Sequence, residues 1–294
     1  IHLRSKKNTV ISHLTKNNFH FIGSGVDHKG YDYLYEKNIK QQHQLVYFNN
    51  KPEWESDWLE ELFVNENIVY EKFQENKHYE SPIYIIQNPN DVINKINLEI
   101  PFMLIHLSDE NYLYDLSIYH HSNCKHIFRN YILPDCKLEN ITYFPLGYKK
   151  GMFINETSKI CQDCEDRKYL WNFCGDITKN NRSKFINELK MICPNYIHKI
   201  HKFNDEKSLS PDKYKDVLKN SYFTLCFRGF NNIDTFRLIE ALECGSIPII
   251  MKYNFNNNKK FDNEYYKDLL GENHPLPVFD DLKTDNNLEE FLQD

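Results

Sequence analysis

The sequence predicts an α/β fold of two Rossmann-like domains that face a central cleft, and three observations support this. The chain has 294 residues, of which 40% are apolar and 15% aromatic, so it can bury a large core and its length favours two domains. Short β-rich runs alternate with amphipathic segments, as in parallel sheets covered by helices. The segment 146–167 interrupts this alternation with charges and glycines, as a linker does. We therefore expect domains at 1–150 and 151–275, with a C-terminal tail at 276–294 that packs back across them.

The first domain is expected to contain six strands and two helices. The strand candidates are short runs rich in β-branched and aromatic residues, whereas the helix candidates are amphipathic. Trp54 and Trp58 lie four residues apart on one predicted helix and are interpreted as core or interface residues. The predicted strands are 19–23, 44–48, 83–87, 102–107, 126–131 and 141–144, and the predicted helices are 53–63 and 91–96.

The second domain repeats the alternation without an internal sequence repeat. Open parallel sheets bind ligands beyond the carboxyl ends of their strands, so the loops at those ends are predicted to form the site. These loops follow Ile22, Leu107, Cys174, Phe227 and Met251. The predicted strands are 169–174, 196–202, 222–227 and 246–251, and the predicted helices are 183–192, 211–220 and 235–244.

The charge balance and the hydropathy pattern narrow the range of partners. The formal net charge is -6, from 36 basic and 42 acidic residues, so the chain lacks the basic excess that collects nucleic-acid phosphates. No apolar run is long enough to span a bilayer, and a soluble, cytoplasmic protein is expected. Because the chain begins with Ile1 and not Met, location in the Golgi lumen after removal of an N-terminal anchor stays open as an alternative.

Eight cysteines are too few for a disulfide scaffold in a chain of this length, and most are interpreted as reduced core residues. Cys161 and Cys164 form a C-x-x-C motif. No second cysteine pair or histidine pair completes a tetrahedral zinc set around it. The sequence therefore predicts no metal site.

The segment from Phe223 to Met251 carries the strongest chemical signal. It reads as a buried strand, a loop, a helix that starts near Asp234 and a second buried strand. The start of such a helix offers free N–H groups and a positive dipole end to an anion such as a diphosphate. Arg237 and Glu240 share a helix face, where a cation can neutralise a diphosphate and a carboxylate can accept both ribose hydroxyls. The alternative is that they form only a surface ion pair on a crossover helix.

The motifs of this segment resemble the signature of the exostosin-like glycosyltransferases, a family of the glycosyltransferase family 47 type. From Arg237 to Ile250 the chain reads R-x-x-E-A-L and then G-x-I-P-(V/I)-I. Upstream, FCGDITKNNRSKFINEL resembles the strand, glycine turn and Arg-Ser helix start of the family, with Gly175, Arg182 and Ser183 in place. Three first-half segments are similar to the branch that contains the ribitol β-1,4-xylosyltransferases and their viral and protist relatives: LIHLSDE at 104–110, IFRNY at 127–131 and FPLGY at 144–148.

The resemblance implies a GT-B fold and transfer, with inversion, of a sugar from a nucleoside diphosphate donor. For this branch the implied donor is a UDP-sugar, with xylose as the best match, and the acceptor is a hydroxyl of a glycan or glycoprotein. The family needs no metal or other cofactor, and the acidic segments 163–166 and 280–281 do not follow a predicted strand of the site. An alternative is a non-catalytic nucleotide-sugar-binding protein of the same fold. The implied donor-binding residues are Gly175, Arg182, Ser183, Arg228, Asp234, Thr235, Arg237 and Glu240.

Inverting transfer needs one general base opposite the leaving diphosphate, and it is expected in the first domain. Asp109 and Glu110 follow a predicted strand on the cleft side and are the candidates. The alternative is that Asp109 caps a following helix and Glu110 is solvated. Arg129 could reach the cleft, pair with one of these carboxylates or bind the donor phosphate.

The turn Gly23-Ser24-Gly25 is interpreted as an acceptor-side loop at the cleft. Its glycine spacing does not fit a dinucleotide fingerprint, and the acidic residue expected about 20 positions later is missing. A dehydrogenase or an epimerase, which would bind NAD, is therefore the weakest of the readings.

Overall fold

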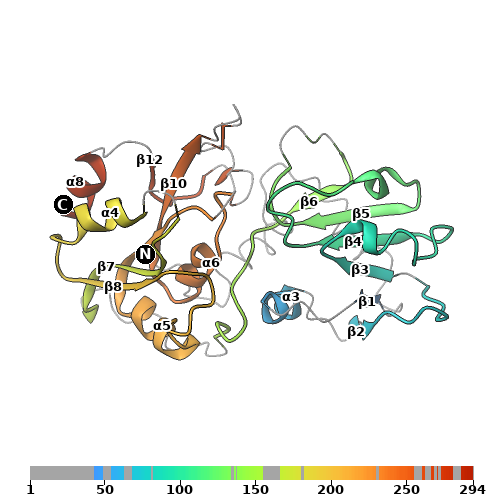
Figure 1. Ribbon diagram of the computed structural model, residues 1–294, viewed down its shortest axis with the longest axis horizontal. Helices are drawn as coiled ribbons and strands as arrows, with labels where there is room; N and C mark the ends of the chain where they lie inside the picture. Colours follow the sequence, from blue (N-terminus) through green and yellow to red (C-terminus); the bar gives the residue numbers. More distant parts are fainter. Residues whose placement is uncertain are drawn as a thin grey trace.

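The computed structural model shows two α/β lobes side by side, and among the described residues the segment after β6 leads from one sheet to the other (Figure 1). The predicted strand at 19–23, the turn Gly23-Ser24-Gly25 and the pair Cys161 and Cys164 lie outside the described residues. The structure describes residues 43–48, 54–62, 68–80, 82–133, 136, 138–154, 166–179, 182–229, 232–254, 260–261, 266–267, 270, 273–280 and 286–293.

The first lobe is built on a six-stranded parallel sheet with the strand order β2-β1-β3-β4-β5-β6. Its central strands, β3 and β4, read PIYII and FMLIH and are buried along their whole length, as expected for parallel strands covered on both faces. The elements are β1 His43–Tyr47, α3 Ser56–Leu62, β2 Ile68–Lys72, β3 Pro82–Ile86, β4 Phe102–His106, β5 Cys124–Arg129 and β6 Ile141–Tyr143.

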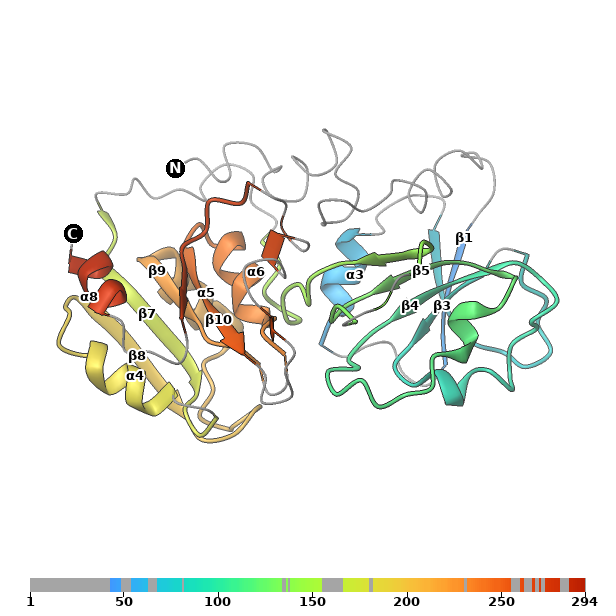
Figure 2. The same cartoon turned by 90° about the horizontal axis from the view of Figure 1, so that it is seen from above.

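The second lobe has the strand order β11-β10-β9-β7-β8, with β12 also paired to β10. Apart from the antiparallel β11, its strands run parallel. Helices α4 and α8 cover one face of this sheet, and α5 and α6 cover the other (Figure 2). The elements are β7 Tyr169–Asp176, α4 Arg182–Leu189, β8 Asn195–Ile200, α5 Pro211–Lys219, β9 Ser221–Cys226, α6 Phe236–Glu243, β10 Ile247–Asn254, β11 Lys260–Phe261, β12 Val278–Asp280 and α8 Asn286–Gln293.

These two facing halves confirm the predicted α/β fold of the GT-B type. Most predicted elements are present within a few residues of their expected bounds, but the helix predicted at 91–96 is wrong. The chain there forms a short 3-10 helix, Pro89–Asp91, followed by turns. Val92, Ile93 and Ile96 are β-branched and alternate with asparagines, which are weak helix formers, so the amphipathic spacing does not produce a helix.

The described part of the C-terminal tail lies on the second sheet. Strand β12 pairs with β10, and Leu288 and Leu292 of α8 pack in a cluster with Trp171 and Phe173 of β7. Among the residues that the structure describes, no helix has the length and apolar character needed to cross a membrane.

A single hydrophobic cluster continues from one half into the other. It includes Trp58 of α3, Tyr148 of the connecting segment, and Ile239 and Leu242 of α6. Figure 1 shows why, because α3 and α6 lie on the sides of their lobes that face each other. The segment after β6 therefore packs against both halves.

Candidate active site

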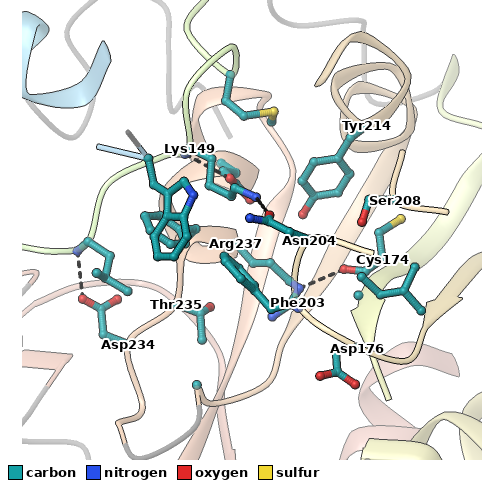
Figure 3. Close-up of a pocket in the computed structure, with 18 of the residues that line it drawn as sticks. Lys149, Cys174, Asp176, Phe203, Asn204, Ser208, Tyr214, Asp234, Thr235 and Arg237 are labelled. Atoms are coloured by element: carbon teal, nitrogen blue, oxygen red, sulfur yellow. Dashed lines mark hydrogen bonds between the residues drawn. The ribbon is translucent and has the colours of Figure 1, made fainter. Parts of the chain in front are cut away.

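A cavity of about 480 Å³ opens between the two halves and is lined by residues of both (Figure 3). Its walls include the loops after Leu107, Cys174 and Phe227, as predicted from the carboxyl ends of the strands. The start of α3 and the start of α6 complete it. The cavity is large enough for a nucleotide-sized ligand.

The start of α6 presents polar atoms that find no hydrogen-bond partner among the described residues. Thr235 occupies the N-cap position in extended backbone, yet its side chain makes no capping hydrogen bond. Its Oγ1 atom and Asp234 Oδ1 are buried and have no hydrogen-bond partner among the described residues. Because both residues line the cavity, these atoms and the first N–H groups of the helix are placed to meet a ligand.

Arg237 lies on the same wall and is held in one orientation. Its Nε donates to the Cys174 carbonyl oxygen at 3.0 Å, as Figure 3 shows, and its guanidinium lies over the Phe173 ring at 5.3 Å. Gly175 makes room for it, because an added Cβ there would overlap the Arg237 Nη2 atom. The glycine turn and the arginine, far apart in the sequence, thus form one unit.

Arg182 adds a second cation to this wall. It is buried, lines the cavity, and donates from Nη1 to the Asp176 carbonyl oxygen at 2.8 Å. Its Nη2 contacts the carbonyl oxygen of Arg228. Arg228 and Ser183 are not among the residues that line the cavity, so of these three predicted residues only Arg182 lines it.

Glu240 is buried and lies one helical turn beyond Arg237 on α6. Its Oε1 accepts a hydrogen bond from the backbone N–H of Lys149 at 3.2 Å, which ties α6 to the segment after the first sheet. Burial raises the pKa of Glu240, while the Lys149 N–H and the Arg237 charge oppose that shift. Glu240 lines the cavity together with Tyr214 of α5.

Asp109 and Arg129 lie behind the cavity wall. Arg129 Nη2 and Asp109 Oδ2 are 2.8 Å apart, and their side chains are 0% and 2% exposed. Arg129 also donates to Tyr119 Oη at 3.0 Å. The expectation that Arg129 reaches the cleft is corrected here, because its full set of donors is used inside the first half. Of the alternatives open from the sequence, the pairing with Asp109 is the one that forms.

Glu110 lines the cavity and contacts the other half. Its Oε1 accepts the backbone N–H of Asn232 at 3.2 Å, in the loop between β9 and α6. An added Cβ on Gly229 would lie 2.8 Å from the same oxygen, so this loop approaches Glu110 closely. Glu110 is therefore not solely solvated, and it helps to hold the loop that leads to the α6 start.

Glu55 is a cavity-lining carboxylate that the sequence did not single out. It is only 2% exposed, and its Oε1 accepts from Ser108 Oγ at 3.0 Å. Burial raises its pKa, partly opposed by the Ser108 hydrogen bond. No motif marks this residue, because the pattern of its segment, 53–63, predicted only an amphipathic helix.

An aromatic pair at the cavity rim joins the two halves. The rings of Trp54 and Phe203 meet edge to face with centroids 5.0 Å apart. Lys149 Nζ lies 4.7 Å from the Phe203 centroid and donates to Asn204 Oδ1 at 2.9 Å. Trp54 is thus an interface residue and Trp58 a core residue, in line with the sequence interpretation.

The fold and the shared cavity define the chain as a protein of the GT-B class. Residues 149–288 match the family described as the RXYLT1 C-terminal domain. Ribitol-5-phosphate xylosyltransferase 1 of Danio rerio is 32% identical over 132 residues, which are 42% of this chain and 30% of that protein. The match therefore spans less than a third of this relative.

These two matches confirm the resemblance predicted from the motifs: the second half of the chain is similar to the exostosin-like, xylosyltransferase-related family. A crystal structure of an α1,3-fucosyltransferase is also similar, with 13% identity and a TM-score of 0.43 over 71% of this chain and 69% of that one.

Proposed function

We propose that the chain is an inverting glycosyltransferase that moves a sugar, best matched by xylose, from a UDP-sugar to a hydroxyl of a glycan acceptor. The observation that carries the proposal is that one cavity holds both cations suited to a diphosphate and carboxylates from the opposite half. Arg182, Arg237 and the start of α6 line it from the second half, together with the carboxylates of Asp176, Asp234 and Glu240, whereas Glu55 and Glu110 line it from the first. A leaving diphosphate needs the cations, and an acceptor proton needs a carboxylate.

The donor is proposed to lie along the second half. Its diphosphate would accept from the N–H groups at the start of α6, the Thr235 hydroxyl and the two arginines. The ribose hydroxyls would donate to Glu240, whose burial makes such hydrogen bonds strong. With this much positive charge at the diphosphate, we propose that the leaving group departs without a divalent metal.

Xylose as the donor sugar rests on the relatives alone. The family match, at residues 149–288, covers the half in which the donor is proposed to bind. A glycan hydroxyl as the acceptor rests on the same resemblance.

The test is a panel of UDP-sugars assayed for hydrolysis and for transfer to glycan acceptors, with the product anomer determined by NMR. We expect turnover with UDP-xylose, inversion at the anomeric carbon and full activity in EDTA. If no donor is turned over and UDP does not bind, the proposal is overturned. UDP binding without turnover would instead identify a non-catalytic nucleotide-sugar-binding protein.

A further inference from the structure

The first-half wall of the cavity carries two carboxylates, and their surroundings differ. Glu110 already serves as a hydrogen-bond acceptor for the Asn232 N–H of the opposite half, 3.2 Å away. Glu55 instead accepts a hydrogen bond within its own half, from Ser108 Oγ at 3.0 Å. The first carboxylate holds a loop, whereas the second is oriented within the wall that would face an acceptor.

The backbone around Glu55 is held in an unusual form. Ser108 after β4 and Tyr131 after β5 are non-glycine residues with φ of 65° and 61°, in the left-handed region. Both line the cavity with Glu55. The Ser108 N–H donates to Asn130 Oδ1 at 3.0 Å, which fixes the turn that presents the Ser108 hydroxyl. Strained backbone of this kind persists where the surrounding structure over-determines it, and it clusters at active sites.

We infer that Glu55, oriented by Ser108, is the general base that takes the proton of the acceptor hydroxyl. This inference rests on the proposed glycosyl transfer and assigns its proton acceptor. As the acceptor O–H bond breaks, the proton passes to the Glu55 carboxylate and the oxygen's electron pair forms the bond to the anomeric carbon. The bond from that carbon to the diphosphate oxygen breaks at the same time, and its electron pair leaves with UDP.

The charged and titratable groups that face Glu55 suit this role. Burial is the largest cause that raises the pKa of Tyr131, and the nearby carboxylates of Glu110, Asp234 and Glu55 raise it further. Tyr131 therefore stays a neutral hydrogen-bond donor. Burial raises the pKa of Glu55 above its usual 4.5. A carboxylate of raised pKa is a stronger base near neutral pH than a solvated one.

The experiment compares Glu55→Gln with Glu110→Gln and with Glu60→Gln, where Glu60 is an exposed glutamate on helix α3, which begins directly after Glu55. Gln at position 55 keeps the acceptor atom for Ser108. We expect Glu55→Gln to lower kcat by about a hundredfold or more while the Kd of UDP changes by less than about threefold. Glu60→Gln should match the wild type, and Glu110→Gln should mainly weaken donor binding.

Two further readouts separate a base from a structural residue. The acidic limb of the wild-type kcat profile should disappear in Glu55→Gln, and Glu55→Asp should recover part of the lost rate because it keeps a carboxylate. Wild-type transfer that persists within about threefold in Glu55→Gln would overturn the assignment and leave the proposed function standing. A parallel loss of UDP affinity and thermal stability in that variant would also overturn it. A wild type without transfer would instead defeat the proposed function itself.

Discussion

At the scale of single residues, Gly175 is placed where its lack of a side chain decides the position of a cation. Gly175→Ala would put a methyl group into the space of the Arg237 guanidinium, which is the flexible end of a long side chain. We expect the fold to survive, because the arginine can move, while the Kd of UDP rises by about tenfold, the equivalent of roughly 1.4 kcal/mol.

Calorimetric titration with UDP and a thermal melt measure the two effects separately. The matched control is Gly151→Ala, where the added Cβ would meet Pro211 at 3.0 Å and no arginine. Unchanged UDP affinity in Gly175→Ala would contradict the role assigned to Arg237.

The buried pair of Arg129 and Asp109 is a second feature of this scale. Arg129→Met leaves the Asp109 carboxylate buried without its cation and should lower the free energy of unfolding by about 3–5 kcal/mol. The control is Lys215→Met, which removes an ion pair to the highly exposed Asp212 and should cost at most about 1 kcal/mol. Urea denaturation measures both. Similar losses in the two variants would show that burial of the first pair does not govern its energy.

At the scale of elements, the segment after β6 is locked against α3 through Gly147. This residue has a φ of 77°, and an added Cβ would overlap the Trp58 ring. Gly147→Ala therefore combines backbone strain with overpacking, and we expect a loss of roughly 2–5 kcal/mol in unfolding free energy. Gly151→Ala, with a φ of 84°, shares the strain but has only a mild contact, with Pro211 at 3.0 Å, and should lose about 1–2 kcal/mol. Equal losses would mean that the Trp58 contact adjusts freely.

The start of α6 should make stability depend on pH. Burial raises the pKa of Asp234 from 3.8 to about 7, although its carboxylate accepts hydrogen bonds from the N–H groups of Leu146 and Thr235. Since the folded chain then holds a proton that the unfolded chain has lost, stability falls as the pH rises from about 4 to about 7.

Asp234→Asn keeps a carbonyl oxygen as an acceptor for the Leu146 N–H but cannot ionise. The stability of the variant relative to the wild type should therefore increase as the pH rises through that window. Urea denaturation at several pH values measures the difference. A difference that does not change with pH would contradict the raised pKa.

The elements that the sequence predicted well are those with a local signal. The strands PIYII and FMLIH are continuous apolar runs that can only be buried, and the R-x-x-E-A-L helix carries its own motif. Strand β2, IVYEK, is short and half charged, so its pattern did not separate it from a loop. The short α8 was missed for a similar reason.

The part of the site that escaped prediction depends on contacts between distant residues. Glu55 directly precedes helix α3, and that helix is positioned in part by the packing of Trp58 against Tyr148, 90 positions later in the chain. The pairing of Arg129 with Asp109, and not with Glu110, likewise depends on the turn after β4. No periodicity or spacing within one segment encodes either choice.

At the scale of the whole molecule, the two halves share more than a cavity. Besides the continuous hydrophobic cluster, two backbone N–H groups of the connecting segment, at Leu146 and Lys149, donate to Asp234 and Glu240 of the second half at 3.0 and 3.2 Å. Separating the halves would therefore expose apolar surface and leave the buried Asp234 and Glu240 without these hydrogen bonds. Each of these changes costs free energy.

We accordingly expect both halves to unfold in one cooperative transition, and the three tryptophans allow a direct test. Trp58 lies in the core of the first half and Trp171 in that of the second. A Trp54→Phe/Trp171→Phe variant reports by fluorescence on the first half, and a Trp54→Phe/Trp58→Phe variant reports on the second. Within each variant, the urea transition seen by fluorescence should coincide with the one seen by circular dichroism, whatever stability the substitutions remove. A Trp171 transition displaced from that of the backbone would show that the shared cluster does not couple the halves.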